Sequence, residues 1–176
     1  APVLTLRDAA KLAKELYGLE GSVQELPSER DQNFLVRVGD ARSVLKISNA
    51  TEEQAMLEAQ NQAMAKVEGL RLLPQVLDSL RGEKIETVSL SGRDHFVRRV
   101  TYVDGAPMGN LMRHSAGLMF DLGYKLGLLD TSLQDFDHPA LHRDFHWDFV
   151  NGLEIVRRNV KLVRDKNLRD MVLALT

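Results

Sequence analysis

Lys46 is the residue whose type and position point most directly to chemistry. It lies within Ser43-Val44-Leu45-Lys46-Ile47, a run that otherwise reads as a buried β-strand. Lysine is disfavoured inside strands and is almost never fully buried without a partner, so the position predicts an anion near its ammonium group. Phosphate in a low-dielectric cleft needs such a cation, held on an element that does not move. The alternative is a lysine on the solvent face of an edge strand.

Hydrophobic periodicity predicts the elements that must position this lysine. Their order is helix, three strands, helix and three strands, expected over residues 5–17, 21–26, 34–38, 43–48, 51–67, 75–80, 84–90 and 95–103. Thr5 and Thr51 are expected to begin the two helices, and Gly18 to end the first. After the turn Asp104-Gly105-Ala106-Pro107 the pattern is helical, with amphipathic helices expected over 115–134 and 145–163.

Composition narrows the class of protein. The chain has 176 residues, 44% of them hydrophobic, with a net charge of -2 and a pI near 6.2. Such a charge gives no basic field for wrapping nucleic acid, so no nucleic-acid partner is expected. No apolar stretch approaches the roughly 20 residues that a membrane-spanning helix needs, so no membrane partner is expected. The absence of cysteine excludes disulfides, thiolate zinc sites and a cysteine nucleophile, and a cytoplasmic location is expected.

Two neighbouring segments favour the phosphate hypothesis. The helix after the lysine strand carries Glu58 and Gln60 on its inner face, where a polar group could fix the rotamer of the lysine, as in kinase-like lobes. The turn-forming segment 27–33 lies between the first two strands, where Ser28 and Asn33 could supply donors to a phosphate. This segment contains no glycine, unlike the loop of protein kinases, and an ordinary charged hairpin tip is the alternative.

Four linked stretches carry a resemblance to a known family. They are Ser28-Glu29-Arg30-Asp31-Gln32-Asn33-Phe34, Val44-Leu45-Lys46-Ile47-Ser48-Asn49, His95-Phe96-Val97-Arg98 with Thr101-Tyr102-Val103-Asp104-Gly105, and Phe136-Asp137-His138-Pro139-Ala140. Together they resemble the aminoglycoside phosphotransferase and choline kinase-like superfamily, and most closely its hydroxylysine kinase-like branch. A domain of this branch also occurs fused ahead of class III aminotransferases. The likeness covers nearly the whole chain.

The resemblance implies a fold, a cofactor and a set of site residues. The fold is α+β, a protein-kinase-like N-lobe of antiparallel sheet with one packed helix, followed by the first helices of a helical C-lobe. Residues 1–103 would be the nucleotide-binding lobe, and 104–176 the hinge and a partial helical lobe. The full-length protein would use ATP or GTP with Mg²⁺. The implied nucleotide-binding residues are Ser28, Arg30, Asn33, Lys46, Glu58, Gln60, Thr101, Tyr102 and Val103.

Two departures distinguish this sequence from the family pattern. The antibiotic kinases of the family face the strand lysine with a glutamate, whereas spacing puts Gln60 there, which can orient Lys46 but cannot neutralise it. The catalytic loop His-Gly-Asp-x-x-x-x-Asn is not found in the sequence. His142-Arg143-Asp144 imitates it, but the position that should hold asparagine is Phe149. Asp144 is a candidate catalytic residue, and the favoured interpretation is that it caps the following helix.

Histidine spacing raises a second hypothesis, a metal site. His138, His142 and His146 are four residues apart, as zinc ligands on one helix face can be. Pro139 argues against one continuous helix through them, so surface histidines are favoured and no metal ligand is assigned. Asp165 is at a tolerable distance beyond the catalytic candidate for a metal ligand, but its charged surroundings contain no Asp-Phe-Gly or equivalent.

The sequence therefore predicts the N-terminal portion of a small-molecule phosphotransferase, incomplete for catalysis by itself. The full-length enzyme would transfer the γ-phosphoryl group of ATP or GTP to a hydroxyl of a small amine-bearing acceptor, with the base and metal ligands beyond Thr176. The alternative is a non-catalytic binding or regulatory module with a kinase-like fold, which could be attached to a PLP-dependent aminotransferase.

Overall fold

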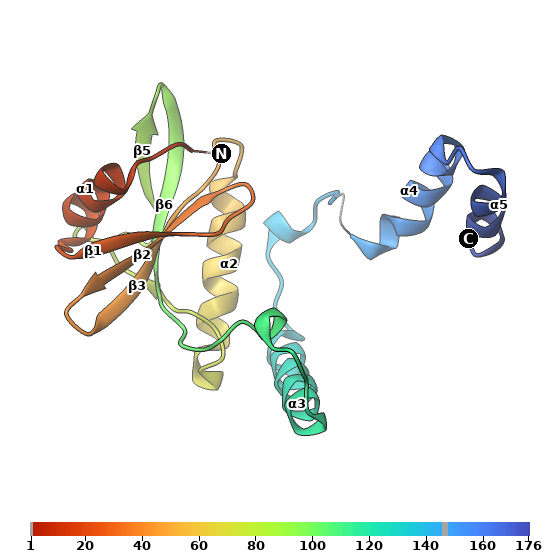
Figure 1. The fold of residues 1–176 in the computed structure, drawn as a ribbon. Coiled ribbons are helices and arrows are strands. Elements are labelled where there is room, and N and C mark those ends of the chain that lie inside the picture. The colour runs from red at the N-terminus through yellow and green to blue at the C-terminus, as the bar shows by residue number, and fades with distance from the viewer. Residues whose placement is uncertain (1, 146–147) are drawn as a thin grey trace. The chain divides into compact units, whose positions relative to one another are not determined.

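The computed structural model describes residues 2–145 and 148–176, which divide into two compact units, Ala1–Leu141 and His142–Thr176. The first unit combines an antiparallel sheet with helices, which confirms the predicted α+β class (Figure 1). The lobe boundary expected between residues 103 and 104 stays a prediction.

A six-stranded antiparallel sheet forms the centre of the first unit. Its strands follow the order β1-β2-β3-β6-β4, and β5 also pairs with β6. β4 is much shorter than the expected strand over 75–80, because the backbone N–H groups of Ser79 and Leu80 donate to a turn and to α1 instead of a strand. The strands are Ser22–Leu26 (β1), Gln32–Val38 (β2), Ala41–Ile47 (β3), Val76–Leu77 (β4), Glu86–Leu90 (β5) and Arg93–Thr101 (β6).

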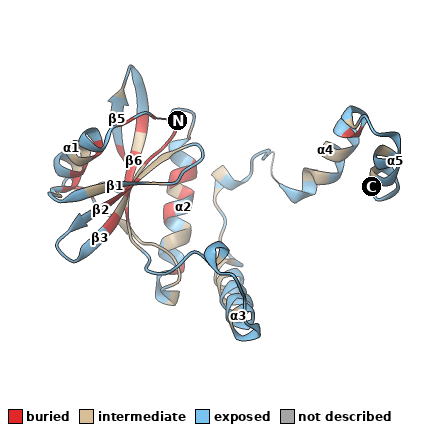
Figure 2. Cartoon of the chain, viewed as in Figure 1, coloured by how far each residue is buried: buried red, intermediate tan, exposed pale blue. Residues whose placement is uncertain are grey.

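Helix α1 (Leu6–Tyr17) covers one face of the sheet. Thr5 caps it as expected, because its hydroxyl accepts from the backbone N–H of Asp8 while the carboxylate of Asp8 accepts from the N–H of Thr5. Gly18 ends the helix with a φ of 65°, a conformation that glycine adopts without strain. The buried core beneath α1 consists of Leu4, Ala9, Ala13, Tyr17, Phe34, Val36, Leu45, Ile47 and Val97 (Figure 2).

Helix α2 (Gln54–Lys66) lies on the opposite face of the sheet from α1 (Figure 1). It begins later than expected, at an N-cap Glu53 without a side-chain hydrogen bond. Thr51 does not cap it, because its hydroxyl donates to Asn49 Oδ1 at 2.6 Å. Its buried residues include Leu57 and Asn61, and the helix contacts β4 and α3.

Successive side chains of β6 point to opposite faces of the sheet, so the strand contributes to both the α1 face and the α2 face. Val97 belongs to the core under α1, whereas the guanidinium of the next residue, Arg98, donates to the carbonyl oxygen of Leu57 in α2. In the strand register Lys46 lies opposite Arg98, and Asn33 lies opposite Lys46. Asn33, Lys46 and Arg98 therefore form a row across β2, β3 and β6 on the α2 face, which we call the polar row.

Helix α3 (Ala116–Leu133) matches the helix expected over 115–134, with Ser115 as a cap that accepts from the N–H of Leu118. It has no buried residues (Figure 2), and the side chain of Phe120 is 76% exposed. In the described part of the chain, no helix is long and apolar enough to cross a membrane. Short 3₁₀ helices occur at Glu68–Leu70, Met108–Asn110, Pro139–Leu141, Phe149–Asn151 and Val160–Leu162.

The second unit contains α4 (Gly152–Asn159) and α5 (Lys166–Ala174). The helix expected over 145–163 is shorter than predicted, and its cap is not Asp144. Asp148 accepts from the N–H of Val150 at the start of the preceding 3₁₀ helix. Asp165, considered above as a metal ligand, caps α5 by accepting from the N–H of Leu168.

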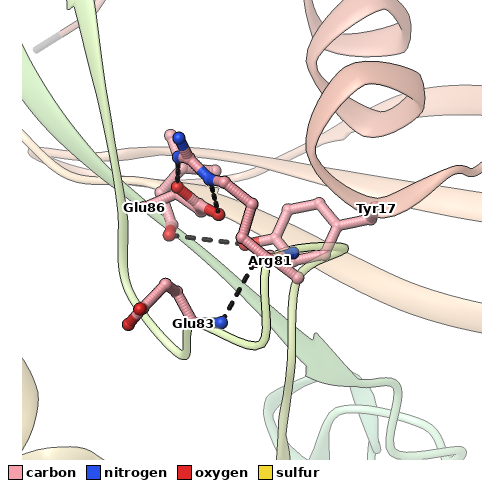
Figure 3. A network of polar contacts seen from close by, with 6 residues as sticks. Tyr17, Arg81, Glu83 and Glu86 are labelled. Atoms are coloured by element: carbon pink, nitrogen blue, oxygen red, sulfur yellow. Dashed lines mark hydrogen bonds and ion pairs between the residues drawn. The ribbon is translucent and has the colours of Figure 1, made fainter.

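An ion pair between a buried carboxylate and a largely exposed arginine fixes the turn before β5. Glu86 is only 2% exposed, and its carboxylate accepts from Arg81 Nε at 3.0 Å and pairs with Arg81 Nη2. The hydroxyl of Ser79 accepts from the backbone N–H groups of Arg81 and Glu83. Close by, the hydroxyl of Tyr17 donates to a carbonyl oxygen of β6 at 3.4 Å. Figure 3 shows that these groups join α1, the turn and the sheet.

Removal of the Arg81 guanidinium should destabilise the chain. Arg81→Ala leaves the buried Glu86 carboxylate without its cation, and because the Arg81 side chain is itself 66% exposed, the cost should be about 1–2 kcal/mol, below that of a fully buried pair. The free energy of unfolding from denaturant titration at neutral pH measures the effect. Arg81→Lys keeps the charge and should cost less, and Glu86→Gln added to Arg81→Ala should recover part of the loss. Equal stabilities of Arg81→Ala and the wild type would contradict the role given to this pair.

Tyr17 should make stability fall at alkaline pH. Burial raises the pKa of its phenol from 10.0 to about 12. Because the unfolded chain loses this proton near pH 10 and the folded chain keeps it, stability that is present below pH 10 is lost as the pH rises towards the folded-state value. The free energy of unfolding of Tyr17→Phe, measured against the wild type across this interval, should fall less steeply. Parallel pH curves for the two proteins would contradict this prediction, because they would mean that the phenol ionises with the same pKa in the folded and the unfolded chain.

Candidate functional site

The polar row brings two cations together beside α2. Lys46 on β3 and Arg98 on β6 are direct cross-strand partners, and residues opposite each other on one face of an antiparallel pair lie close together. Like charges in this arrangement repel, so something else must stabilise the row. Lys46 is half-buried and Arg98 is 5% exposed, so solvent screens the repulsion only in part.

Lys46 has a neutral hydrogen-bond partner. Its Nζ donates to Asn33 Oδ1 at 3.2 Å, across the β2–β3 pair. Burial lowers the pKa of Lys46, the charge of Arg98 lowers it further, and Asp31 opposes both effects. The anion that the sequence predicts beside Lys46 is therefore not supplied as a hydrogen-bonded carboxylate by the described residues.

Arg98 is held by α2 through three acceptors, all of them neutral. Its Nη1 donates to Asn61 Oδ1 at 2.7 Å and to the carbonyl oxygen of Leu57 at 3.3 Å, and its Nη2 donates to Gln60 Oε1 at 2.8 Å. Burial lowers the pKa of Arg98, and Glu52 is the first of the charges that oppose this shift. The guanidinium stays charged, because its ordinary pKa is far above neutrality.

The helix residues expected to position Lys46 bind elsewhere. Gln60 accepts from Arg98, and Glu58 accepts from Gln54 Nε2 at 2.8 Å within α2. The expectation that either one orients Lys46 by direct contact is corrected by these partners. The physical reason is that Arg98 presents a planar set of donors to several acceptors on α2 at once, which a single ammonium does not. Arg98 and Asn61 were missed by sequence reasoning, although the alternation of β6 and a helical spacing would have placed both on this side.

The loop before β2 is fixed to the segment after β3. Asp31 Oδ1 accepts from the backbone N–H and from Nδ2 of Asn49, each at 3.0 Å. Arg30 Nη2 lies 3.5 Å from Thr51 Oγ1, and Ser28 is exposed. Of the three predicted loop residues, only Asn33 contacts Lys46 in the described structure.

The predicted hinge residues, Thr101, Tyr102 and Val103, lie at the end of β6 and just after it, a few positions beyond Arg98. The N–H of Thr101 donates to the carbonyl oxygen of Gln75 at 2.8 Å, and its hydroxyl accepts from the N–H of Gln75 at 2.9 Å. Tyr102 lies under the guanidinium of Arg42, 5.1 Å from the ring centre, and Arg42 also pairs with Asp104 at 2.5 Å. The side chains on both sides of Val103, which is 53% exposed, are therefore held in place.

Asp144 and the histidines do not form a described metal or catalytic cluster. Asp144 Oδ1 accepts from Asn151 Nδ2 at 3.3 Å within the second unit. His138 Nδ1 accepts from the N–H of Ala140, and His146 lies outside the described residues. Across residues 2–145 and 148–176, no group of three or more metal-ligating side chains comes together.

A cleft of about 960 Å³ lies away from the polar row. It is lined by α1, the β5–β6 hairpin and residues 49–51, and neither Lys46 nor Arg98 lines it. Its charged lining residues have both signs, among them Lys11, Arg30 and Glu15. The polar row is the better candidate site, because two adjacent cations with neutral hydrogen-bond partners select for an anion, and mixed charges do not.

Comparisons with known proteins identify relatives of this chain. No family model matches the chain. Hydroxylysine kinase of Danio rerio is 31% identical over 163 residues, which cover 85% of this chain and 46% of that protein. Hydroxylysine kinase of Mus musculus is 29% identical over 171 residues, covering 85% of this chain and 45% of that protein. The chain thus spans a little under half the length of the curated relatives it matches.

Solved structures show the same kinase-like fold. An amicoumacin kinase in complex with AMP-PNP, Ca²⁺ and Ami superposes with a TM-score of 0.69 at 14% identity, over 96% of this chain and 54% of that chain. A spectinomycin phosphotransferase with ADP and its antibiotic gives 0.66 at 12% identity, over 94% and 49%. A microcompartment-associated aminopropanol kinase gives 0.60 at 21% identity, over 86% and 48%. Sequence relationship and fold together show that the chain belongs to the aminoglycoside phosphotransferase and choline kinase-like superfamily.

Proposed function

We propose that this chain forms the nucleotide-binding side of a cytoplasmic small-molecule phosphotransferase that uses ATP or GTP with Mg²⁺. The observation that carries the proposal is the pair of adjacent cations, Lys46 and Arg98, whose hydrogen-bond partners are all neutral. Nucleotide phosphates would supply the missing negative charge. In such a site catalysis is almost entirely positioning and electrostatic stabilisation of the transferred phosphoryl group.

Each predicted group then has a defined task. Lys46 would contact the phosphates, with Asn33 holding the ammonium in place between strands. The loop that contains Ser28 and Arg30 would cover the phosphates from the side of β2. The N–H of Thr101 is already engaged with Gln75, so the base would meet the backbone of Tyr102 and Val103.

The transfer step itself belongs to the proposal for the whole protein. The 176 residues contain no His-Gly-Asp-x-x-x-x-Asn motif, so we assign the base and the Mg²⁺ ligands to sequence outside them. A hydroxyl on a small amine-bearing molecule is the proposed acceptor. Two similar proteins support this class of acceptor. They are named as kinases of hydroxylysine and of aminopropanol, and both of these molecules carry an amine and a hydroxyl.

A non-catalytic binding or regulatory module is the second candidate, in a protein that could also carry an aminotransferase domain. The missing catalytic motif and the local role of Asp144, which holds Asn151, favour it. A radiometric assay of ATP turnover by the chain separates the two readings of Asp144. Activity that Asp144→Asn abolishes would place the base within this chain, and no activity would leave Asp144 a structural residue.

Nucleotide titration tests the proposed site. ADP and ATP, with and without Mg²⁺, should raise the thermal midpoint of the chain in a saturable manner, and Lys46→Met should weaken this binding by about tenfold or more, since it removes a partly desolvated charge contact. Lys84→Met removes an exposed lysine before β5 and is the matched control, expected to bind as the wild type does. Absence of any binding at millimolar ATP, GTP or ADP would overturn the proposal.

Lys46→Met should also stabilise the chain without ligand. The replaced ammonium is partly buried beside a like charge, and removing such a functional-site conflict gains about 1 kcal/mol. Burial lowers the pKa of Lys46, so the unfolded chain binds more protons and wild-type stability rises as the pH passes from the folded-state value to the ordinary one. The advantage of the variant should therefore be full at neutral pH and shrink at alkaline pH. Denaturant titrations at neutral and at alkaline pH measure the difference in stability between the variant and the wild type. A variant less stable than the wild type at neutral pH would contradict the view that the Lys46 ammonium destabilises the free chain.

A further inference from the structure

The connection between α2 and the sheet at the polar row is made by Arg98 and not by Lys46. Three acceptors of α2, from Leu57, Gln60 and Asn61, receive hydrogen bonds from one guanidinium. The ammonium of Lys46 turns to Asn33 on the neighbouring strand. The two cations thus have separate sets of partners, although they are opposite each other in the sheet.

We propose that Arg98 is a positioning residue that anchors α2 to the sheet while its charge, left uncompensated by its neutral acceptors, reserves Lys46 for the phosphates of a bound nucleotide. This inference rests on the proposed function and deepens it. In kinase-like lobes where a helix carboxylate pairs with the strand lysine, helix anchoring and lysine orientation depend on one ion pair. Here the two tasks are divided between two cations.

The neutrality of the acceptors is the step on which the inference depends. A carboxylate at position 60 or 61 would hold Arg98 equally well and would also neutralise the row. The amides of Gln60 and Asn61 satisfy the buried donors of the guanidinium without doing so. A buried donor is therefore never left unpaired, and the positive charge of the row is retained for a ligand.

The other charged groups near the row make no hydrogen bond to Lys46 or Arg98 among the described contacts. The charge of Asp31 acts on both cations from a distance, while its Oδ1 accepts from Asn49. Glu52, before α2, acts on Arg98 without a hydrogen bond to it among the described contacts. Tyr17 acts on Arg98 from the α1 side, and its phenol is neutral at physiological pH because burial raises its pKa to about 12. Glu58 of α2 is bound to Gln54.

Gln60→Glu is the variant that tests the inference most sharply. It is nearly isosteric, keeps an acceptor for Arg98 and adds the negative charge that the row lacks. Gln62→Glu is the matched control, because it adds the same charge at an exposed position of the same helix. Arg98→Met removes the charge and the anchor, whereas Arg98→Lys keeps the charge and loses the planar set of donors.

The first measurement needs no nucleotide. Titration of the Lys46 side chain by NMR, with its signal assigned by its loss in Lys46→Met, should give a higher pKa in Gln60→Glu and in Arg98→Met than in the wild type, and an unchanged pKa in Gln62→Glu. A purely structural Arg98 would not move this titration when Gln60→Glu leaves the fold intact. An unchanged Lys46 titration in Gln60→Glu overturns the inference, whether or not the chain binds nucleotide.

The second measurement compares ADP with adenosine by calorimetry. Gln60→Glu should weaken ADP binding by about tenfold, as expected for one added charge near the phosphates, and leave adenosine binding unchanged. Gln62→Glu should change neither. Arg98→Lys should retain the preference for ADP over adenosine but lose hydrogen-exchange protection of the α2 amides, which separates charge from anchoring.

The outcomes of the two measurements distinguish the two proposals. Wild-type chain that binds neither ADP nor ATP overturns the proposed function, and with it the phosphate half of this inference, while the Lys46 titration still decides the electrostatic half. ADP binding that is equally tight in the wild type, Gln60→Glu and Arg98→Met leaves the proposed function standing and overturns the inference. Because Gln60→Glu conserves shape, the test does not depend on whether Arg98→Met folds.

Discussion

The structure depends on how the donors of one buried guanidinium, that of Arg98, are hydrogen-bonded. Arg98 is 5% exposed on a strand whose neighbouring residue, Val97, is fully buried under α1 on the other face. A buried cation is tolerated only if its donors are satisfied, and α2 is the element that satisfies them. The position of α2 is therefore set by a polar contact in the middle of the sheet as well as by its apolar face. The same contact leaves the neighbouring ammonium of Lys46 with a partner that carries no charge.

Most of the fold follows from local signals in the sequence. Helix α1 combines a capping box at Thr5, an apolar stripe and a left-handed glycine, and each of these acts within a few residues. The β2 and β3 strands follow from alternation and a short turn between them. The signal fails where a distant group decides the structure. Thr51 is a good cap by type, but Asn49, itself fixed by Asp31, engages its hydroxyl. The strand over 75–80 is shortened because Leu80 donates its N–H to α1, far back in the sequence.

The position of Lys46 could be predicted from the sequence, but the hydrogen bonds that link the candidate site to α2 could not. A lysine inside an apolar strand indicates Lys46 without any structure, whereas Asn33, expected only as a donor to a phosphate, lies in β2 and accepts from Lys46. What the sequence does not reveal is which of two cations the helix will hold. Spacing along the sequence predicts that Gln60 contacts Lys46. In the structure, the register of β6, fixed by its pairing with three strands, brings Arg98 to Gln60 instead. Register between distant strands is a property of the whole sheet, and no local pattern encodes it.

The pairing of β6 also has a consequence for the order in which the chain can fold. β6 pairs with β3, β4 and β5, and Arg98 lies 52 positions along the chain from Lys46, its partner in β3 (98 − 46). Until Arg93–Thr101 has been synthesised, β3 has one edge without a neighbour, and α2 has no guanidinium to hold it. Contacts of such long sequence separation are formed late and slow the folding of a domain. The nascent β1–β3 meander therefore presents the unpaired backbone edge of β3 for a time, which makes it the segment where aggregation competes with folding.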